Sequence, residues 1–521
     1  MHKFYKTVER EYHEPVEGKV TGTIPPWIRG SLYRNGPGMY EVGNTKFNHL
    51  FDPMAMFQRF HVSDGKAYYQ CRYLRSDTYN RNMAANRIVV TEVGTVAFPD
   101  PCKNIFQRFL SYFQPNDKPR DNTLVSFYPM KDELYASTET DAIHKVDPET
   151  LDSLGKVEIS KYVAVNMATA HPHWDRDGTL HNIGYSFAKG PKVCLIKFPP
   201  KARPEDDFPQ GKVVASLSPG GKFSINYFHS FAMTENYYIF VAQPLYINLL
   251  KVLAAQFRGV PPNTAIEWWP DIKAKFRIIR KSNGEEVSPD VTYEADPFMV
   301  FHHINAYEDN EHIVIDLCAF ENKDAFEYVN LKNLQGDQCL ENWRKIDNPE
   351  ARRYILPLNI DKEMPLQSNL VKLTYTEASA TLVNQSTINC KHEKLASIGL
   401  EFPQIHYQKY NTKKYRYMYG VGWHKDGKHF NTLAKIDVQS KTYLEWAEDN
   451  TYPSEPVFVP DPDGAEEDDG VLMSAVNDTD FESGKQAFLL ILNAKTMHEL
   501  ARVHFNIPRF PRDFHGLFRN T

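Results

Sequence analysis

One pattern occurs twice near the end of the chain, in TLAKIDVQSKTYLEWAED (432–449) and AFLLILNAKTMHELARVHF (487–505). In each segment an apolar run ends at Asp437 or Asn493, a short polar turn follows, and a second run begins. Short apolar runs separated by such turns are typical of consecutive β-strands. The two turns are spaced close to the ~40–50-residue period of a four-stranded propeller blade. The segments therefore predict an all-β fold and favour a β-propeller.

The same rhythm continues towards the N-terminus. The segment ELYASTETDAIHKVDPETLDSLGKVEI (133–159) has Asp147 at the corresponding turn. Further strand candidates are IVVTEVGTVAF (88–98), YYIFVAQPL (237–245) and HIVIDLCAF (312–320). No shift in composition divides the chain, so we expect residues 1–521 to form a single propeller domain.

Composition excludes several classes of protein. A net charge of −6 gives no sign of a nucleic-acid-binding face. The 6 cysteines are isolated, which argues against a disulfide scaffold or a thiolate metal site and fits a reducing cytosol. The first residues lack the apolar core of a secretory signal, and no window approaches the ~18 apolar residues of a spanning helix. We expect a cytoplasmic protein that does not cross a membrane.

Two segments depart from the strand pattern. In CKNIFQRFLSYF (102–113) and YINLLKVLAAQFRGV (246–260) the apolar residues recur at helical spacing. We expect them to belong to insertions near 102–115 and 246–270. One interpretation is a helical cap packed on the β-core; the other is a patch that dips into one membrane leaflet. The residues leave both open.

Four of the 19 histidines lie in apolar or aromatic settings on strand-like segments. Imidazoles carried by different blades can converge on a propeller axis, which all blades approach. The sequence has no H-E-x-x-H pattern or cysteine cluster, so a local zinc motif is absent. The four settings are NMATAHPHWD (His171), INYFHSFAM (His229), FMVFHHINAYED (His302) and PRDFHGLF (His515).

Short segments along nearly the whole chain resemble the carotenoid cleavage oxygenase family. Each is short, but nine in the same order are highly specific. The resemblance implies a seven-bladed β-propeller with a helical cap over the metal-bearing face. The matching segments are RGSLYRNGPG, LRSDTYNRNMAANRIVV, PDPCKNIF, STET, AHPH, FHHINAYED, LEFPQI, YPSEPVFVP and FHGLF.

The resemblance also implies a metal site with one Fe(II) per chain and O2 as co-substrate. In AHPH the family's ligand is the first histidine, with His173 as its neighbour; strand periodicity alone does not decide between them. In FHH the two side chains alternate in direction, and the family pattern selects His302 over His303. Imidazoles also bind Zn(II) and Cu(II), so the metal follows from the family and not from the ligands. The implied ligands are His171, His229, His302 and His515.

Three glutamates are implied as partners of these ligands. A ligating histidine usually donates its second ring N–H to a carboxylate, which fixes its tautomer. By resemblance Glu139, Glu401 and Glu455 pair with His229, His302 and His515 respectively. Thr138 matches a threonine whose methyl group crowds an open iron position. Any single glutamate or threonine is more often a solvated or ordinary strand residue.

Substrate-lining positions are carried over from the family at Val93 and Phe320. The sequence departs from the family at Pro53, where FDG is usual, and at Val93, where vertebrate members have phenylalanine. The second departure removes an aromatic side chain and weakens the transfer of tunnel contacts. The tripeptide FDP (51–53) is similar to the corresponding segment of the insect members of the family, which combine cleavage with isomerisation.

The implied function is cleavage of the central 15,15′ double bond of a carotenoid or xanthophyll to retinal-type aldehydes, with trans-to-11-cis isomerisation of one half. Alternatives are a retinyl-ester isomerohydrolase, an asymmetric carotenoid cleaver and a non-catalytic carotenoid-binding protein. We expect peripheral, monotopic contact with intracellular membranes, no nucleic acid and no obligate protein partner. Cys102 matches a position lipidated in some relatives, and the acidic segment DPDGAEEDDG (461–470) is expected to be solvated surface.

Overall fold

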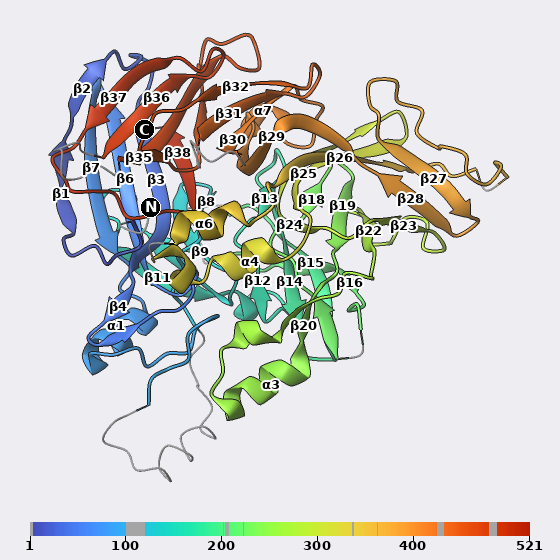
Figure 1. Cartoon of the computed structure of the whole chain (residues 1–521), viewed down its shortest axis with the longest axis horizontal. Helices are drawn as coiled ribbons and strands as arrows, with labels where there is room; N and C mark the ends of the chain where they lie inside the picture. Colours follow the sequence, from blue (N-terminus) through green and yellow to red (C-terminus); the bar gives the residue numbers. More distant parts are fainter. Residues whose placement is uncertain are drawn as a thin grey trace.

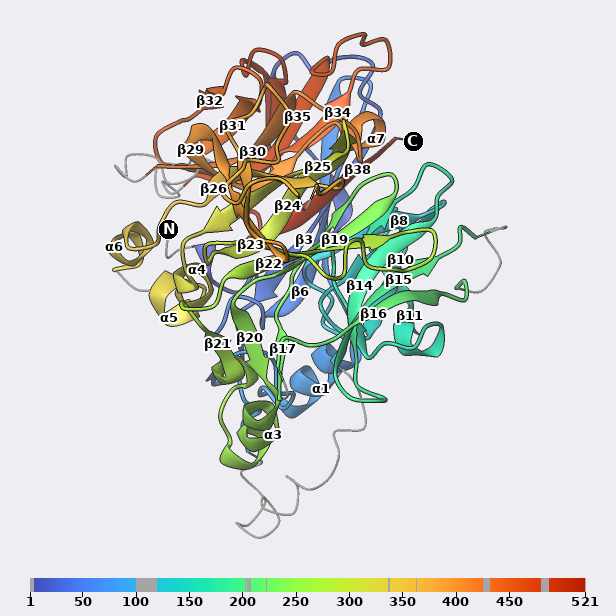
Figure 2. The same cartoon turned by 90° about the vertical axis from the view of Figure 1, so that its right-hand side faces the viewer.

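Most of the chain forms antiparallel sheets arranged around a common centre, as Figures 1 and 2 show for this computed structural model. The last strand of the chain pairs with residues 30–35 near its beginning, so segments from the two ends of the chain lie side by side (Figure 1). The structure describes residues 4–99, 120–201, 203, 208–221, 223–335, 338–361, 363–424, 432–478 and 487–520.

Two consecutive sheets form the blades that follow the N-terminal region. The first has the strands β8 (Ser126–Met130), β9 (Glu133–Ser137), β10 (Ala142–Val146) and β11 (Ser153–Glu158), in chain order across the sheet. The second has β12 (Met167–Ala168), β13 (His173–Trp174), β14 (Leu180–Ser186), β15 (Lys192–Phe198) and β16 (Lys212–Leu217). Each is a meander of neighbouring strands, as the alternation of apolar runs and turns predicts.

The next blade is enlarged by a hairpin from later in the chain. Its strands are β18 (Ala232–Met233), β19 (Tyr237–Ala242), β22 (Ala274–Arg280) and β23 (Thr292–Ala295), extended by β27 (Ser379–Asn384) and β28 (Thr387–Lys391). A small separate sheet holds β17 (Ser224–Asn226), β20 (Leu245–Asn248) and β21 (Ile266–Trp268). β23 and β28 run parallel, whereas the other pairs in the blade are antiparallel.

A seven-stranded sheet contains two blades that share one long strand. The N-terminal part of β29 pairs with β26, opposite Arg352 and Arg353, and its C-terminal part pairs with β30, opposite Tyr419 and Val421. One 12-residue strand thereby serves both neighbours. The strands are β24 (Met299–Asp309), β25 (His312–Phe320), β26 (Glu350–Pro357), β29 (Glu393–Gln404), β30 (Tyr417–Trp423), β31 (Thr432–Asp437) and β32 (Thr442–Trp446).

The last two blades join the two ends of the chain. One combines β33 (Thr451–Pro453), β34 (Val457–Pro460), β35 (Gly470–Asp478), β36 (Phe488–Asn493) and β37 (Glu499–His504) with the early strand β2 (Lys19–Gly22). The other combines β1 (Tyr12–Glu17), β3 (Gly30–Met39), β6 (Met54–Ser63) and β7 (Lys66–Tyr73) with the final strand β38 (His515–Asn520). The described residues thus form a seven-bladed propeller, closed by pairing its last strand with one of its first.

Apolar side chains fill the spaces between neighbouring blades. The cluster at the closure contains Phe60 of β6, Met473 of β35, Leu489 of β36 and Val503 of β37, all fully buried. Alternating strand residues supply these contacts because successive side chains point to opposite faces of a sheet. The closure is therefore held by core packing as well as by strand pairing.

Helices gather outside the blades. α1 and α3 lie towards the same lower end of the molecule in both views (Figures 1 and 2), and α4 lies near the centre of Figure 1. α1, α3 and α4 belong to the helical cap, whereas α7 lies near the upper end of both views. The helices are α1 (Asp77–Ala85), α3 (Leu249–Arg258), α4 (Asp324–Tyr328), α5 (Leu331–Leu334), α6 (Cys339–Arg344) and α7 (Tyr407–Tyr410), with short 3₁₀ turns η2 (Ile159–Lys161) and η3 (Pro262–Ala265) and a two-stranded pair, β4 (Glu41–Val42) and β5 (Thr45–Lys46).

The helix predicted within 246–260 is present as α3; Leu249 packs on the core, but other apolar side chains of the helix face outward. Asn248 caps its start by accepting from the Lys251 N–H, and Gly259 ends it in the left-handed region. Leu253 and Phe257 are 59% and 62% exposed. No helix of the described residues is long and apolar enough to cross a membrane. The other predicted insertion, 102–115, lies outside the described residues, as does Cys102.

The strand predicted over residues 88–98 is wrong. No strand forms there, and the segment is irregular. Its backbone groups bond elsewhere: Ile88 N–H donates to Thr45 Oγ1, and the carbonyl of Val93 accepts from Asn263 N–H. The apolar alternation that suggested a strand instead places Ile88 and Val90 in the interior.

Candidate metal centre

Four histidines from distant parts of the chain meet at one point. His302 lies on β24, His515 begins β38, and His171 and His229 lie in the loops before β13 and β18. One ring nitrogen from each lies within 4.8 Å of those of the other three. His171 and His229 are closest, with their Nε2 atoms 2.8 Å apart. Imidazole nitrogens grouped at this spacing form a set that could hold a metal ion.

The rings surround the point from different directions. The centroid of His171 lies 4.4 Å from His229, 5.1 Å from His302 and 4.6 Å from His515. The planes of these three pairs are tilted by 58°, 80° and 88°, so His171 is stacked on none of the other three rings. Burial and the neighbouring imidazoles hold the pKa of His171 well below its usual value, so this ring is neutral and keeps a free lone pair.

A carboxylate lies behind each of three rings. His302 Nδ1 lies 2.5 Å from Glu401 Oε2, and His515 Nδ1 lies 2.8 Å from Glu455 Oε1. His229 Nδ1 contacts Glu139 in the same way. When Nδ1–H donates to a carboxylate, the Nε2 lone pair faces the opposite side. The three pairs have the partners that the resemblance implies.

One ring nitrogen of the cluster lacks a hydrogen-bond partner. His302 Nε2 is buried and has none. A buried polar atom without a partner is costly, and native proteins rarely keep one without a reason. A metal ion bound by this lone pair would satisfy it, so the residues present fit a metal.

Arg34 joins this network, and our reading of the sequence missed it. Its guanidinium is fully buried and makes two hydrogen bonds to Asp513 and one, of 3.1 Å, to Glu455 Oε2. Burial alone would raise the pKa of Glu455, but His515 and Arg34 outweigh it and hold the pKa below its usual value. Arg34 therefore keeps the carboxylate that orients His515 charged. Its position in RGSLYRNGPG was the available signal.

The two histidines set aside by the family pattern point elsewhere. His173 bonds to the hydroxyl of Tyr407 and the carbonyl of Phe231, at 2.9 Å and 3.0 Å. His303 Nδ1 lies 2.8 Å from Ser230 Oγ. Burial lowers the pKa of His173 to about 4 and that of His303 to about 3, so both are neutral. Neither belongs to the cluster around the centre.

Three of the four histidines, His229, His302 and His515, line a largely apolar cavity of about 410 Å³. Both predicted substrate-lining residues, Val93 and Phe320, line it, as do Thr138 and Glu139. Aromatic side chains supply much of the wall, and ligand sites of this kind are usually apolar with a few placed polar groups. The aromatic lining residues include Phe301, Phe326, Phe402, Trp343 and Trp423.

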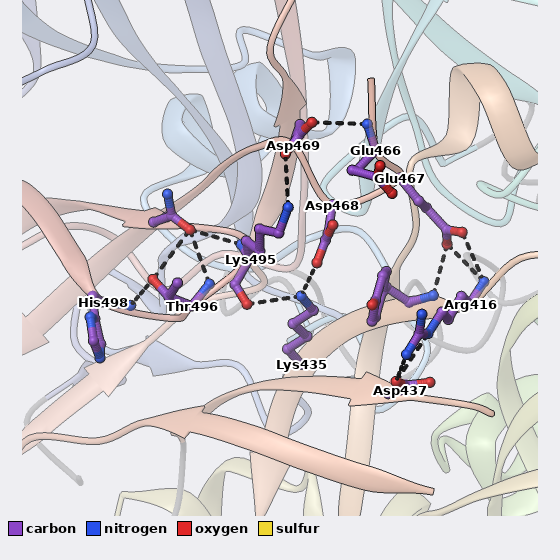
Figure 3. Close-up of polar contacts among 12 residues, drawn as sticks. Arg416, Lys435, Asp437, Glu466, Glu467, Asp468, Asp469, Lys495, Thr496 and His498 are labelled. Atoms are coloured by element: carbon purple, nitrogen blue, oxygen red, sulfur yellow. Dashed lines mark hydrogen bonds and ion pairs between the residues drawn. The ribbon is translucent and has the colours of Figure 1, made fainter. Parts of the chain in front are cut away.

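The acidic segment 461–470, which we expected to be solvated surface, is exposed or partly exposed except at Asp468, and it is also tied to the blades. Asp468 is 3% exposed and bonds to Lys435, which also donates to the carbonyl of Lys495 (Figure 3). Glu467 accepts from the backbone N–H groups of Arg416 and Tyr417. These contacts hold the loop against β30 and β31. They satisfy the carboxylates of Glu467 and Asp468 within the protein and indicate a structural role for these two residues.

The fold and the histidine cluster together define a class: β-propellers that could bind a metal at the inner ends of several blades, beside an apolar cavity. The chain belongs to the family described as retinal pigment epithelial membrane protein, whose model matches residues 5–520. This family includes the animal carotenoid oxygenases, and the chain is an enzyme of the oxygenase class.

Relatives match over almost the whole chain. A mitochondrial carotenoid-cleaving dioxygenase of Macaca fascicularis is 42% identical and covers 98% of this chain and 93% of the relative. The β,β-carotene 15,15′-dioxygenase of Rattus norvegicus is 40% identical and covers 98% and 90%. Among solved structures, a cobalt-substituted apocarotenoid oxygenase of Synechocystis has a TM-score of 0.78 at 22% identity and covers 100% of this chain and 98% of its own. The last comparison supports the fold.

Proposed function

We propose that this chain is an Fe(II)-dependent dioxygenase that cleaves the central 15,15′ double bond of carotenoids or xanthophylls to retinal-type aldehydes. The observation that carries the proposal is the four-histidine cluster at the wall of an apolar cavity. We include trans-to-11-cis isomerisation of one half of the substrate as a coupled step, and take residues 1–521 as one oxygenase unit.

One iron per chain would be held by His171, His229, His302 and His515. Neutral imidazoles suit several divalent metals, and the choice of iron follows from the family. When bound, Fe(II) supplies the activation of O2, the co-substrate, which no amino-acid side chain provides.

The protein's own residues bind, orient and exclude water. Glu139, Glu401 and Glu455 fix the ring orientation of three ligands through Nδ1. The aromatic wall excludes bulk water and aligns the polyene, so that the scissile bond lies near the cluster. Thr138 and Glu139 both line the cavity, where the threonine methyl group limits the space beside the metal. No side chain is required as a general acid or base.

Peripheral contact with intracellular membranes from the cytoplasmic side is part of the proposal. On α3, Leu249 and Val252 line the cavity, whereas Leu250, Leu253 and Phe257 are more than half exposed. One helix therefore has apolar side chains on the cavity and on the surface. Such a helix suits a protein that takes a lipid-soluble substrate from a bilayer.

The direct test is chromatography of the products formed from β-carotene and zeaxanthin by the iron-loaded protein, in air and under argon. We expect C20 aldehydes in air and none under argon. Two aldehydes of unequal length would show asymmetric cleavage. Turnover of retinyl esters without O2 would favour an isomerohydrolase. Binding of carotenoid without any product would favour a carrier.

A further inference from the structure

One carboxyl group in the cavity wall has no role in the metal centre. Glu92 lines the cavity and is 5% exposed. Its Oε1 is buried and has no hydrogen-bond partner. Asn122 also lines the cavity, but its side-chain amide is occupied: Oδ1 accepts from Ala55 N–H at 2.8 Å, and Nδ2 donates to the carbonyl of Pro53 at 2.9 Å. Of these two side chains, only that of Glu92 has an oxygen atom without a hydrogen-bond partner.

The turn that carries Glu92 is held by other groups. Asp52 accepts from the backbone N–H of Gly94 at 3.0 Å and from Thr95 Oγ1 at 2.6 Å. The backbone N–H of Glu92 itself donates to the carbonyl of Thr95. The carboxyl of Glu92 is therefore not needed to form the turn. A rigid turn instead fixes it in the cavity wall.

The charge state of Glu92 suits a neutral partner. Burial raises its pKa to about 8, although Arg120, which also lines the cavity, opposes the shift. At neutral pH the group is mostly the carboxylic acid, which both donates and accepts a hydrogen bond. A hydroxyl group is the matching partner because it too donates and accepts. A hydrocarbon placed there leaves the acid buried and unpaired, which is unfavourable.

We propose that Glu92 is a specificity-determining residue that binds a hydroxyl group of the substrate and so favours hydroxylated carotenoids over hydrocarbon carotenoids. The inference rests on the proposed function, since it assigns a role in the same cavity. It adds a polar contact to a cavity that is largely apolar. β-Carotene and zeaxanthin form the matched pair of probes, because they differ only in the ring hydroxyl groups.

The test compares the kcat/KM ratio of zeaxanthin to β-carotene in the wild type, Glu92→Gln and Glu92→Leu. We expect the wild type to favour zeaxanthin by about ten-fold, the effect of one buried hydrogen bond. Glu92→Leu should bring the ratio close to one, whereas Glu92→Gln should keep most of the preference because an amide still donates and accepts. Val93→Ala is the control: it alters the adjacent wall and should change both substrates in parallel.

A binding measurement separates this inference from the proposed function. Quenching of Trp343 and Trp423, which line the cavity, reports binding of each carotenoid to the iron-loaded protein under argon, without turnover. The ratio of the affinity for zeaxanthin to that for β-carotene should be highest in the wild type, mostly kept in Glu92→Gln and close to one in Glu92→Leu. An equal ratio in wild type and Glu92→Leu, or a wild-type preference for β-carotene, overturns the role of Glu92. Cleavage of neither carotenoid alongside a Glu92-dependent binding ratio overturns the proposed function alone.

Discussion

At the scale of single residues, the site depends on partners that are far apart in the sequence. The histidines and glutamates could be named in advance because each lies in a short segment that resembles a known family. Arg34 and Glu92 were missed because their roles come from neighbours that only the fold supplies. Arg34 meets Glu455 across 421 residues of chain, and Glu92 matters because a cavity forms beside it. Neither relation can be derived from the local sequence alone, although Arg34 lies in RGSLYRNGPG, a segment that resembles the family.

The carboxylates behind the ligands should set metal affinity. Glu401→Gln replaces an anionic acceptor of His302 Nδ1–H by a neutral one, and such changes weaken metal binding by about 10–100-fold. The affinity is measured by competition with a coloured chelator. Glu393→Gln is the matched control: Glu393 is buried on the same strand but pairs with Lys441. Equal affinity in the two variants would contradict the role of Glu401.

Glu92 should make stability depend on pH. Its pKa of about 8 lies above the ordinary value of 4.5, so its contribution to the free energy of unfolding is complete below pH 4.5 and is lost as the pH rises through about 8. Between these values the loss is about 1.4 kcal/mol per pH unit. Glu92→Gln cannot ionise. We therefore expect the free energy of unfolding of Glu92→Gln, measured with denaturant, to rise steadily relative to that of the wild type from pH 5 to pH 8. A difference between the two proteins that stays constant over this range would contradict the burial of a neutral acid.

At the scale of elements, apolar periodicity gave the kind of secondary structure at 246–260, but it did not show what surrounds that helix. The pattern in 246–260 correctly gave a helix, but it could not say whether the apolar face meets the core or the surface. In 88–98 a similar density of apolar residues gave no strand. Asp52 and Asn263, from elsewhere in the chain, make hydrogen bonds to backbone groups of that segment, which a strand would use to pair with a neighbouring strand. Contacts between distant segments decide both cases.

The exposed face of α3 should bind membranes. Leu253→Ser with Phe257→Ser removes two apolar side chains from a surface without disturbing the core, so liposome binding should fall several-fold while the Tm changes little. Co-sedimentation with liposomes measures the bound fraction. Leu444→Ser is the control, because Leu444 is 48% exposed on β32, away from α3. An equal loss of binding in the control, or none in the double variant, would contradict the assignment.

At the scale of the whole molecule, the strand that closes the propeller also carries one of the four histidines of the metal centre. β38 completes the blade that contains β3, and His515 is its first residue, opposite Asn35. The turn rhythm of the sequence indicated blades, but it gave neither their number nor the sharing of β29 by two of them. Those features follow from long-range pairing, which local periodicity does not encode.

A change at the closure should affect stability and metal together. A Cβ at Gly516 would lie 2.5 Å from Arg34 Nη1 and 2.9 Å from the carbonyl of Tyr33. Arg34 is fully buried and cannot withdraw, so Gly516→Ala should cost about 1–3 kcal/mol of unfolding free energy and reduce bound iron. Calorimetry and metal analysis measure the two effects. Gly221→Ala, whose nearest neighbour is 3.6 Å away, should change neither.

The central claim is that four imidazoles hold one iron ion on which cleavage depends. The most direct measurement is the iron content per chain, by elemental analysis, of the wild type, of His171→Ala, His229→Ala, His302→Ala and His515→Ala, and of the control His173→Ala, whose ring faces Tyr407. We predict about one iron in the wild type and the control, and almost none in the other four, with carotenoid cleavage lost in parallel. Iron retained by all four variants, or full cleavage by protein stripped of iron, would contradict the account.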